Sequence, residues 1–222
     1  LDGGFRTSHP MLAGKSVGSP NGLVNLLKCL ELALHDGVDP MTGRLLGPRT
    51  GDASSFDSFE KLWEAYSLQA EFAVNLACEA QLSVHRGFAG EASYLMETLL
   101  LPSCLDKGRG LMEGGPKYSG GVIEIHCNSN VYDSLAAVRQ VVYLEKRLPL
   151  GELVRILDAD FAGEEALRQR LLRCPKFGND DEAVDSLAKR VYEQFARVTL
   201  SHEPPYRPGY MAAVVIHNGA HV

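Results

Sequence analysis

The first residues with the types and spacing for chemistry are Gly14-Lys15-Ser16, which match the end of a phosphate-binding loop. In such a loop the backbone N–H groups surround a phosphate and the Lys side chain neutralises it. The motif also needs a Gly five residues before Gly14, and His9 occupies that position. Without this Gly the backbone cannot direct its N–H groups at a phosphate, so we reject a nucleotide-binding loop here.

Two histidine patterns could indicate a metal site. His217 and His221 have the four-residue spacing of a helical metal pair, but a glycine between them and the apolar run 210–216 before them argue against a helix. We interpret this spacing as chance. His126 and Cys127 are adjacent, so in a strand they would point to opposite faces and could not share one metal.

The five cysteines are odd in number, lie far apart and include no C-x-x-C pair, a pattern typical of reduced thiols rather than of a disulfide framework. We expect most of them to be small buried core residues. They are Cys29, Cys78, Cys104, Cys127 and Cys174.

Composition restricts the class of protein. The 222 residues are 45% apolar and 23% charged, with a net charge of -6, and basic residues alternate with acidic ones along the expected helices. This distribution argues against a nucleic-acid partner. No apolar run approaches the ~20 residues that cross a bilayer and no secretory leader opens the chain, so we expect no membrane partner and a cytoplasmic location. The start at Leu1 and the end at Val222 favour one domain, 1–222, truncated at both ends.

Hydrophobic periodicity predicts helices around a sheet, the α/β class, rather than a helical bundle. We expect a capping box of Asp57 and Glu60 to start the helix 57–82, and Ser129 or Asn130 to cap the helix that begins near residue 130. The acidic run 180–182 is expected to cap the helix 182–200, after a tight turn at Gly178-Asn179. The expected helices are 23–35, 57–82, 94–100, about 130–142, 150–157, 164–172 and 182–200, and the expected strands are 122–125 and 210–216.

Several sequence blocks, in this order, resemble the pyruvate formate-lyase-like glycyl radical enzymes, and the dehydratase and decarboxylase branch in particular. The resemblance covers nearly the whole chain. The blocks are Asn25-Leu26, Leu30 to Leu34, Gly37 to Pro40, Gly47-Pro48, Gly51-Asp52, Phe59-Glu60, Cys104, Lys107-Gly108, Gly114 to Tyr118, Asn130 to Ala137 and Pro175 to Asp185.

The resemblance implies a helix-rich central fragment of a ten-stranded barrel wrapped by helices. Inside the family's barrel, one loop carries a catalytic Cys and another carries a Gly that stores the radical. Burial suits this chemistry, because a carbon radical must be kept from oxygen and solvent.

The family's Cys loop reads Gly-Cys-x-Glu-Pro and is followed shortly by Gly-Lys. Alignment on Pro10 and Gly14-Lys15 places Thr7 at the Cys position and His9 at the position of the acid-base Glu. A Thr O–H bond is too strong to exchange a hydrogen atom readily with a glycyl radical. The family's radical motif, Arg-x-x-Gly-Tyr, is not matched by Arg207-Pro208-Gly209-Tyr210.

Three explanations of Thr7 stay open. The first ten residues belong to a shifted or spliced reading frame, the lineage lost the thiol and kept the fold, or the alignment slips and the true Cys lies before Leu1.

The function implied by the resemblance is radical cleavage of a C–C or C–X bond in a small polar substrate, of the formate acetyltransferase or dehydratase and lyase type. The full-length enzyme would carry a glycyl radical installed by a radical S-adenosylmethionine activase, and a homodimer is a further expectation. We expect this chain itself to bind no cofactor and, alone, to be inert. The alternative is an inactive scaffold or pseudoenzyme that binds a partner.

Overall fold

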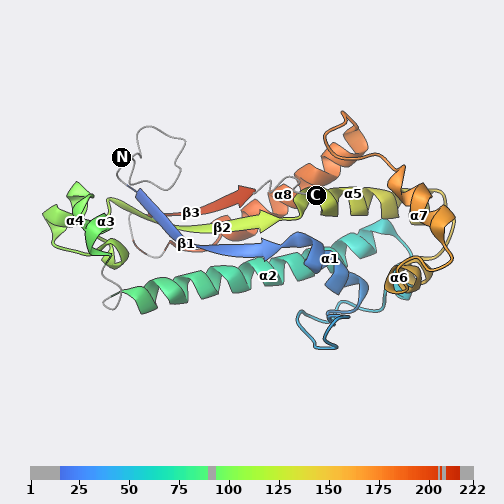
Figure 1. Ribbon diagram of the computed structural model, residues 1–222, viewed down its shortest axis with the longest axis horizontal. Helices are drawn as coiled ribbons and strands as arrows, with labels where there is room; N and C mark the ends of the chain where they lie inside the picture. Colours follow the sequence, from blue (N-terminus) through green and yellow to red (C-terminus); the bar gives the residue numbers. More distant parts are fainter. Residues whose placement is uncertain (1–15, 90–93, 205, 207–208, 216–222) are drawn as a thin grey trace. The chain divides into compact units, whose positions relative to one another are not determined.

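The computed structural model describes residues 16–89, 94–204, 206 and 209–215 (Figure 1). The described residues form two compact units, the first within 16–24, 74–125 and 196–215 and the second within 25–73 and 126–195. Two long helices, α2 (Phe59–Phe88) and α8 (Glu182–Leu200), contribute residues to both units. None of the described helices combines the length and the apolar character that a bilayer-spanning segment needs.

The first unit contains a sheet of strand order β1-β2-β3, formed by β1 (Ser16–Asn25), β2 (Tyr118–His126) and β3 (Gly209–Val215). Strands β2 and β3 are parallel, with Ser119 opposite Gly209. The predicted strand at 122–125 is confirmed by β2, and the one at 210–216 is confirmed by β3 as far as Val215. On β2 the β-branched Ile123 and Ile125 alternate with less buried neighbours.

The helix predicted from residue 23 begins later, and a strand precedes it. Helix α1 spans Leu26–Leu34, and its N-cap is Asn25, whose side-chain oxygen accepts a hydrogen bond of 3.1 Å from the Lys28 N–H. Gly22 lets β1 approach its neighbours, because a Cβ there would lie 2.7 Å from Ile123 Cδ1. Sheet pairing and this close packing outweigh the local helical pattern.

The first unit also holds three short helices that join α2 to the sheet. They are α3 (Leu95–Leu99), α4 (Pro102–Lys107) and the 3-10 helix η3 (Leu111–Glu113). Their apolar side chains form one cluster, against which Phe88 packs: Leu101, Cys104, Leu111 and Met112.

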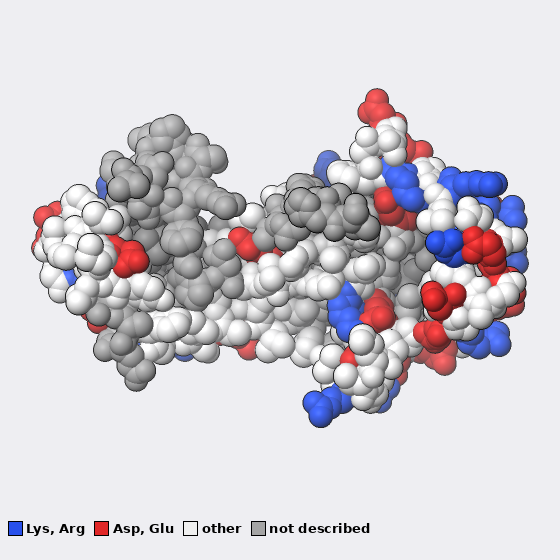
Figure 2. Space-filling view, in the orientation of Figure 1, with Lys and Arg blue, Asp and Glu red and all other residues white. Residues whose placement is uncertain are grey.

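The second unit is helical in its described part. Besides α1 and portions of α2 and α8, it contains the 3-10 helix η2 (Ala53–Ser55), α5 (Asn128–Val138), the π-helix η4 (Arg139–Leu144), α6 (Leu150–Asp158) and α7 (Glu165–Leu172). Figure 2 shows both signs of charge interspersed over α6 and α7. The core of the unit includes Leu30, Leu62, Tyr66, Val131, Leu135, Val141 and Leu153.

The predicted capping box of α2 is wrong. The helix begins at Phe59, and the Ser58 hydroxyl accepts a hydrogen bond of 3.4 Å from the Lys61 N–H. Glu60 instead forms a two-pronged ion pair with Arg190, at 2.6 and 3.1 Å, because a guanidinium matches a carboxylate in geometry.

The predicted caps of α5 are also wrong. The helix starts at Asn128, and Cys127 is its N-cap residue, with a left-handed φ of 58° and no side-chain hydrogen bond to the helix. Ser129 and Asn130 therefore lie inside the first turn rather than before it.

Candidate active-site frame

The residues predicted to carry the chemistry, Thr7 and His9, lie outside the described residues, as do Arg207, His217 and His221. The described part of the chain begins at Ser16 with β1. The described residues of each unit form packed strands, helices and turns. We call this set of packed elements the frame.

One face of β2 is closed by the second half of α2 (Figure 1). The Gln81 side-chain amide donates a hydrogen bond of 2.9 Å to the Val122 carbonyl. Gly121 permits this approach, because a Cβ there would meet Met211 Sδ at 2.5 Å and Gln81 Oε1 at 2.8 Å. Alternation along the strand places Val122 and Glu124 on the opposite face of the sheet, where both are half-buried.

The closed face contains a buried titratable residue, His85. It lies one helical turn beyond Gln81 and is 3% exposed, and neither of its ring nitrogens has a hydrogen-bond partner among the described residues. Ser119, which shares the strand face of Gly121, has a buried hydroxyl that likewise has no partner in the described part of the chain. Burial lowers the pKa of His85, because the interior disfavours the charged imidazolium.

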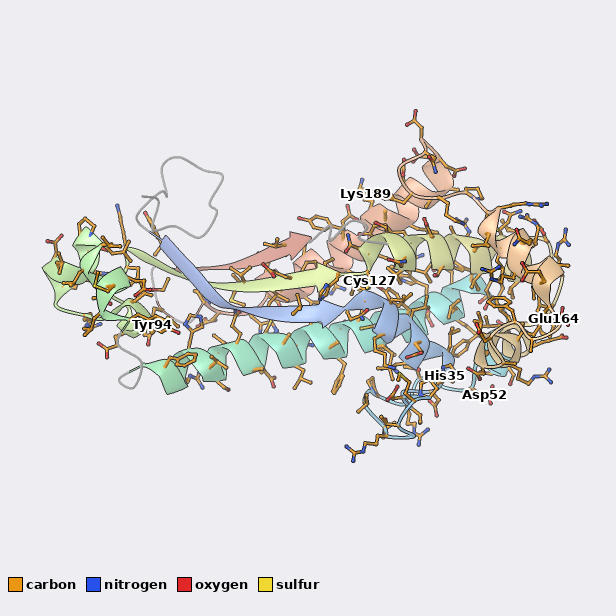
Figure 3. All side chains as sticks on the ribbon, in the orientation of Figure 1. His35, Asp52, Tyr94, Cys127, Glu164 and Lys189 are labelled. Atoms are coloured by element: carbon orange, nitrogen blue, oxygen red, sulfur yellow. The ribbon has the colours of Figure 1, made fainter. Side chains whose placement is uncertain are left out.

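All five cysteines are free, as the sequence predicts, and four of them are buried. Burial raises the pKa of the Cys29 thiol to about 12 and that of Cys78 to about 11, and it also raises the pKa of Cys104. Only the thiolate is a strong nucleophile. These three thiols are therefore core groups rather than nucleophiles. Cys127 is half-buried at the junction of β2 and α5 (Figure 3).

The turn before β2 is held by Lys107. Its ammonium donates hydrogen bonds to the carbonyls of Gly114, at 3.1 Å, and Pro116, at 2.9 Å. Gly115 lies so close to its surroundings that a Cβ would be 2.7 Å from Cys104 Sγ and would also collide with the Arg109 carbonyl. Two of the sequence blocks, at 107–108 and 114–118, are thus one packed turn that sets where β2 begins.

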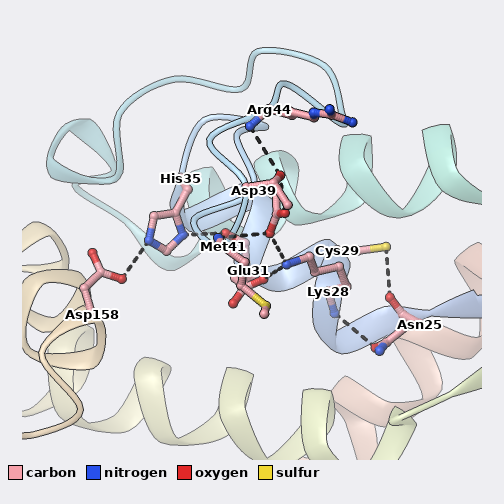
Figure 4. Close-up of polar contacts among 10 residues, drawn as sticks. Asn25, Lys28, Cys29, Glu31, His35, Asp39, Met41, Arg44 and Asp158 are labelled. Carbon is pink, nitrogen blue, oxygen red and sulfur yellow. Dashed lines mark hydrogen bonds and ion pairs between the residues drawn. The ribbon is translucent and has the colours of Figure 1, made fainter.

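The loop 36–52 after α1 is held by two aspartates. Asp36 Oδ1 accepts hydrogen bonds of 2.7 Å from the N–H groups of Thr50 and Gly51. Asp39 pairs with Lys28 on α1 (Figure 4), and the hydrogen bond from this ammonium lowers the pKa of the carboxyl to about 2. The blocks at 37–40 and 51–52 therefore lie at the start and the end of one loop, and the hydrogen bonds of Asp36 hold these two ends together.

The blocks at 130–137 and 175–185 also meet in the structure. The Asp133 carboxylate accepts a hydrogen bond of 2.8 Å from the Phe177 N–H, and Gly178 follows in a left-handed conformation with φ of 85°. Asp181 then caps α8, accepting hydrogen bonds from the N–H groups of Ala183, at 3.0 Å, and Val184, at 3.3 Å. The predicted tight turn and acidic cap are confirmed.

Within the residues that the structure describes, no group of three or more His, Cys, Asp or Glu side chains could hold a metal ion. Neither His126 nor Cys127 belongs to such a group. The described residues supply packing, turns and caps, and the side chains predicted for chemistry precede them in the chain.

Comparison with known proteins identifies this arrangement. The model of the family described as pyruvate formate lyase-like matches residues 8–222. Trans-4-hydroxy-L-proline dehydratase of Clostridioides difficile is 29% identical over 183 residues, which cover 82% of this chain and 23% of that protein. Isethionate sulfite-lyase of Oleidesulfovibrio alaskensis is 32% identical over 178 residues, covering 78% of this chain and 21% of that protein.

A solved glycyl radical enzyme from Archaeoglobus fulgidus superimposes with a TM-score of 0.80 at 30% identity, over 90% of this chain and 25% of that one. The fold and the packed blocks thus define a part of a glycyl radical enzyme barrel. The chain belongs to the pyruvate formate-lyase-like family. It spans about a quarter of the length of the relatives that it matches.

Proposed function

We propose that the chain is the central segment of a glycyl radical enzyme that cleaves a C–C or C–X bond in a small polar substrate. The observation that supports this is the mutual packing of the family's sequence blocks, exemplified by Lys107 with Gly114 and by Asp133 with Phe177. The names of the matched relatives record action on hydroxyproline and isethionate, which are both small and polar.

The family's chemistry needs a glycyl radical in the full-length enzyme, and an iron–sulfur activase that uses S-adenosylmethionine would install it. The residues of this chain do not match the family's catalytic thiol and acid-base carboxylate, because the alignment places Thr7 at the Cys position and His9 at the position of the Glu. No reaction step is therefore assigned to Thr7 or His9. A reducing cytoplasm suits both the five free thiols and an oxygen-sensitive radical, and it is the location we propose.

A second candidate function is an inactive scaffold that keeps the fold and binds a partner. The specific observation in its favour is again Thr7, because a hydroxyl at the thiol position cannot exchange a hydrogen atom with a glycyl radical. The frame, which does not include residue 7, would be retained. The two candidates differ in whether the gene encodes Thr at this position and in whether restoring the thiol restores turnover.

The test begins with resequencing the gene around the codons for residues 1–10. The full-length protein is then activated without oxygen by a competent activase and examined by electron paramagnetic resonance and for turnover of hydroxyproline and isethionate. A glycyl doublet, with turnover in the native protein or in the Thr7→Cys/His9→Glu variant, supports the enzyme. Thr7→Ser, which keeps a hydroxyl, is the matched control and is expected to stay inactive.

Two results would count against the enzyme. The first is the absence of a glycyl doublet from every version of the protein, under conditions in which the activase modifies its own substrate enzyme. The second is a doublet without turnover after the thiol and the carboxylate are restored, which would favour the scaffold.

A further inference from the structure

Helices α1 and α6 of the second unit are joined at their C-terminal ends by the side chain of His35 (Figure 4). His35 is the C-cap residue of α1. Its ring Nδ1 lies 2.8 Å from the backbone carbonyl oxygen of Glu31, and its Nε2 lies 2.9 Å from Oδ1 of Asp158, the last residue of α6. The side chain of His35 is 19% exposed and that of Asp158 is 49% exposed. One imidazole ring therefore bridges the two helix ends from a half-buried position.

The partners of the His35 ring determine how many protons the ring carries. A backbone carbonyl oxygen only accepts hydrogen bonds, and so does an ionised carboxylate, so each ring nitrogen has to donate. A neutral imidazole has a single N–H group and could donate to only one of these oxygens. The two hydrogen bonds together therefore require the imidazolium, in which both nitrogens carry a proton.

The ends of the two helices favour a cation at this place. Carbonyl groups without a partner in the helix give its C-terminus a partial negative charge. The last turn of α1 contains no basic residue, so a protonated His35 supplies the positive charge there. Asp158 places a negative charge at the C-terminus of α6, where the helix dipole disfavours it. The imidazolium offsets this unfavourable charge as well.

The other charged groups around His35 include several carboxylates. Asp36 follows His35 in the chain, and Asp52 forms an antiparallel backbone bridge with it. Hydrogen bonds, chiefly from the Gly51 N–H to Asp36 and from Ser54 to Asp52, lower the pKa of both carboxyls, so both are negative at neutral pH. The titratable groups on the surrounding elements are Glu31 and its ion-pair partner Lys28 on α1, Asp36 with its partner Arg49 and Asp52 in the loop, and Glu152, Arg155 and Asp158 on α6.

His35 also lines an open groove of about 680 Å³ between the loop after α1 and α6. Val38 lies on the side of the loop, and Val154 on the side of α6. A neutral ring that keeps its hydrogen bond to the Glu31 carbonyl turns the lone pair of Nε2 toward the Asp158 carboxylate, and two acceptors repel each other. Loss of one proton therefore breaks the link to α6, while the hydrogen bond within α1 remains.

We propose that His35 is a proton-operated latch: the imidazolium holds the end of α6 against the end of α1 beside the groove, and the neutral ring releases it. The stability that the latch contributes is complete in mildly acid solution, below the ordinary histidine value of about 6.5. It is lost as the pH rises and the ring gives up its second proton. This sign is opposite to that of the buried His85, which is stable as a neutral ring. The latch does not depend on the proposed radical chemistry.

The first test measures the proton affinity of the His35 ring by long-range ¹H–¹⁵N NMR spectra, which distinguish an imidazolium from either neutral tautomer. In a pH series, the native chain is compared with Asp158→Asn, whose uncharged amide can pair with a neutral ring as well as with a charged one. We expect the proton affinity of His35 to be about fivefold higher in the native chain, because an ion pair at a helix C-terminus has this order of strength. Equal proton affinities would overturn the proposal. The comparison leaves His35 itself in place.

The second test is a double-mutant cycle of His35→Gln and Asp158→Asn, with urea denaturation at pH 5.5 and 8.5. The coupling between the two residues should change the unfolding equilibrium constant about fivefold at pH 5.5 and vanish at pH 8.5. The matched control is the exposed ion pair of Lys61 with Asp57, at 2.9 Å, removed by Lys61→Gln and Asp57→Asn. Lysine and aspartate keep their charges over this range, so the control coupling should be equal at both pH values. A His35–Asp158 coupling that is equally independent of pH would show an ordinary hydrogen bond and overturn the latch.

Amide hydrogen exchange tests the release of α6. The Ala159 N–H donates to the Arg155 carbonyl at 3.2 Å in the last turn of this helix. After correction for the intrinsic pH dependence of exchange, its protection should fall about fivefold between pH 5.5 and 8.5 in the native chain and stay constant in Asp158→Asn. Constant protection in the native chain would overturn the release of the helix end.

Discussion

The carboxylate of Asp133 on α5 accepts a hydrogen bond of 2.8 Å from the backbone N–H of Phe177, in the segment that leads to α8. The same segment contributes the Phe177 ring, whose centroid lies 5.1 Å from that of Tyr132 in an edge-on arrangement. Two blocks that are far apart in the sequence therefore form a single packed feature. The hydrogen bond and the ring contact give the two blocks a shared structural role in this chain.

Removal of the Asp133 carboxylate tests this connection. Asp133→Ala leaves the Phe177 N–H without its acceptor, and we expect the free energy of unfolding to fall by about 1 kcal/mol. Asp133→Asn keeps a side-chain oxygen in the same place, so its loss is expected to be smaller. Urea denaturation of the two variants beside the native chain measures the difference, and equal losses would contradict the role of the hydrogen bond.

The N-terminus of α8 gives a second prediction. Asp181→Ala removes the oxygen that accepts hydrogen bonds from Ala183 and Val184, and loss of such a cap reduces stability by about 1 kcal/mol. Asp180→Gly is the control, because it removes the neighbouring carboxylate at a left-handed position that glycine adopts easily. Urea denaturation should show the loss for Asp181 alone; a similar loss at both positions would indicate a general effect of acidic charge.

Helix α8 shows how much the sequence can predict by itself. Its expected bounds, 182–200, agree with the structure, because a strong cap precedes it and its inward positions repeat every three or four residues. All five inward residues are buried: Val184, Leu187, Val191, Phe195 and Val198. Local signals are sufficient where capping and periodicity agree.

Strand β1 and the start of α5 could not be predicted, because they depend on contacts between residues that are far apart in the sequence. Strand β1 includes a proline and six polar or glycine residues, and its place in the sheet rather than its local pattern makes it a strand. Cys127 occupies the N-cap position of α5 in a left-handed conformation, directly after β2 ends at His126, and a list of good capping residues does not reveal this. For the site, Thr7 and His9 came from alignment with the family and remain predictions.

A third prediction concerns the tight turn at Gly115. Gly115→Ala would place a methyl group 2.7 Å from Cys104 Sγ and against the Arg109 carbonyl, and we expect a loss of about 1–3 kcal/mol from overpacking. Gly87→Ala is the matched control, since Gly87 lies within α2 with nothing within 4 Å of a new Cβ. Alanine is favoured over glycine in helices, so this control should gain up to about 1 kcal/mol. Thermal or urea unfolding distinguishes the two, and a loss in both variants would refute the packing argument.

The buried His85 predicts a dependence of stability on pH. Burial lowers its pKa in the folded chain below the ordinary value of about 6.5, so the unfolded chain binds the proton more tightly. The stability associated with neutral His85 is therefore complete above about pH 6.5, and it falls as the pH drops from there toward the folded pKa. The slope contributed by this one group can reach about 1.4 kcal/mol per pH unit.

His85→Leu removes the titrating group along with two ring nitrogens that no described residue pairs with, and it tests the source of this dependence. We expect its stability at neutral pH to change little, because replacing unsatisfied buried polar atoms offsets the altered packing. Between pH 5 and 7 the free energy of unfolding of this variant should depend less on pH than that of the native chain. The difference between the two slopes can reach the value for one proton, about 1.4 kcal/mol per pH unit. Urea denaturation across this range measures both slopes.

His202→Leu is the control, since the His202 ring bonds to the Asn75 side chain at 2.8 Å and is less buried. Equal slopes for the native chain and His85→Leu would show that His85 is not the group responsible.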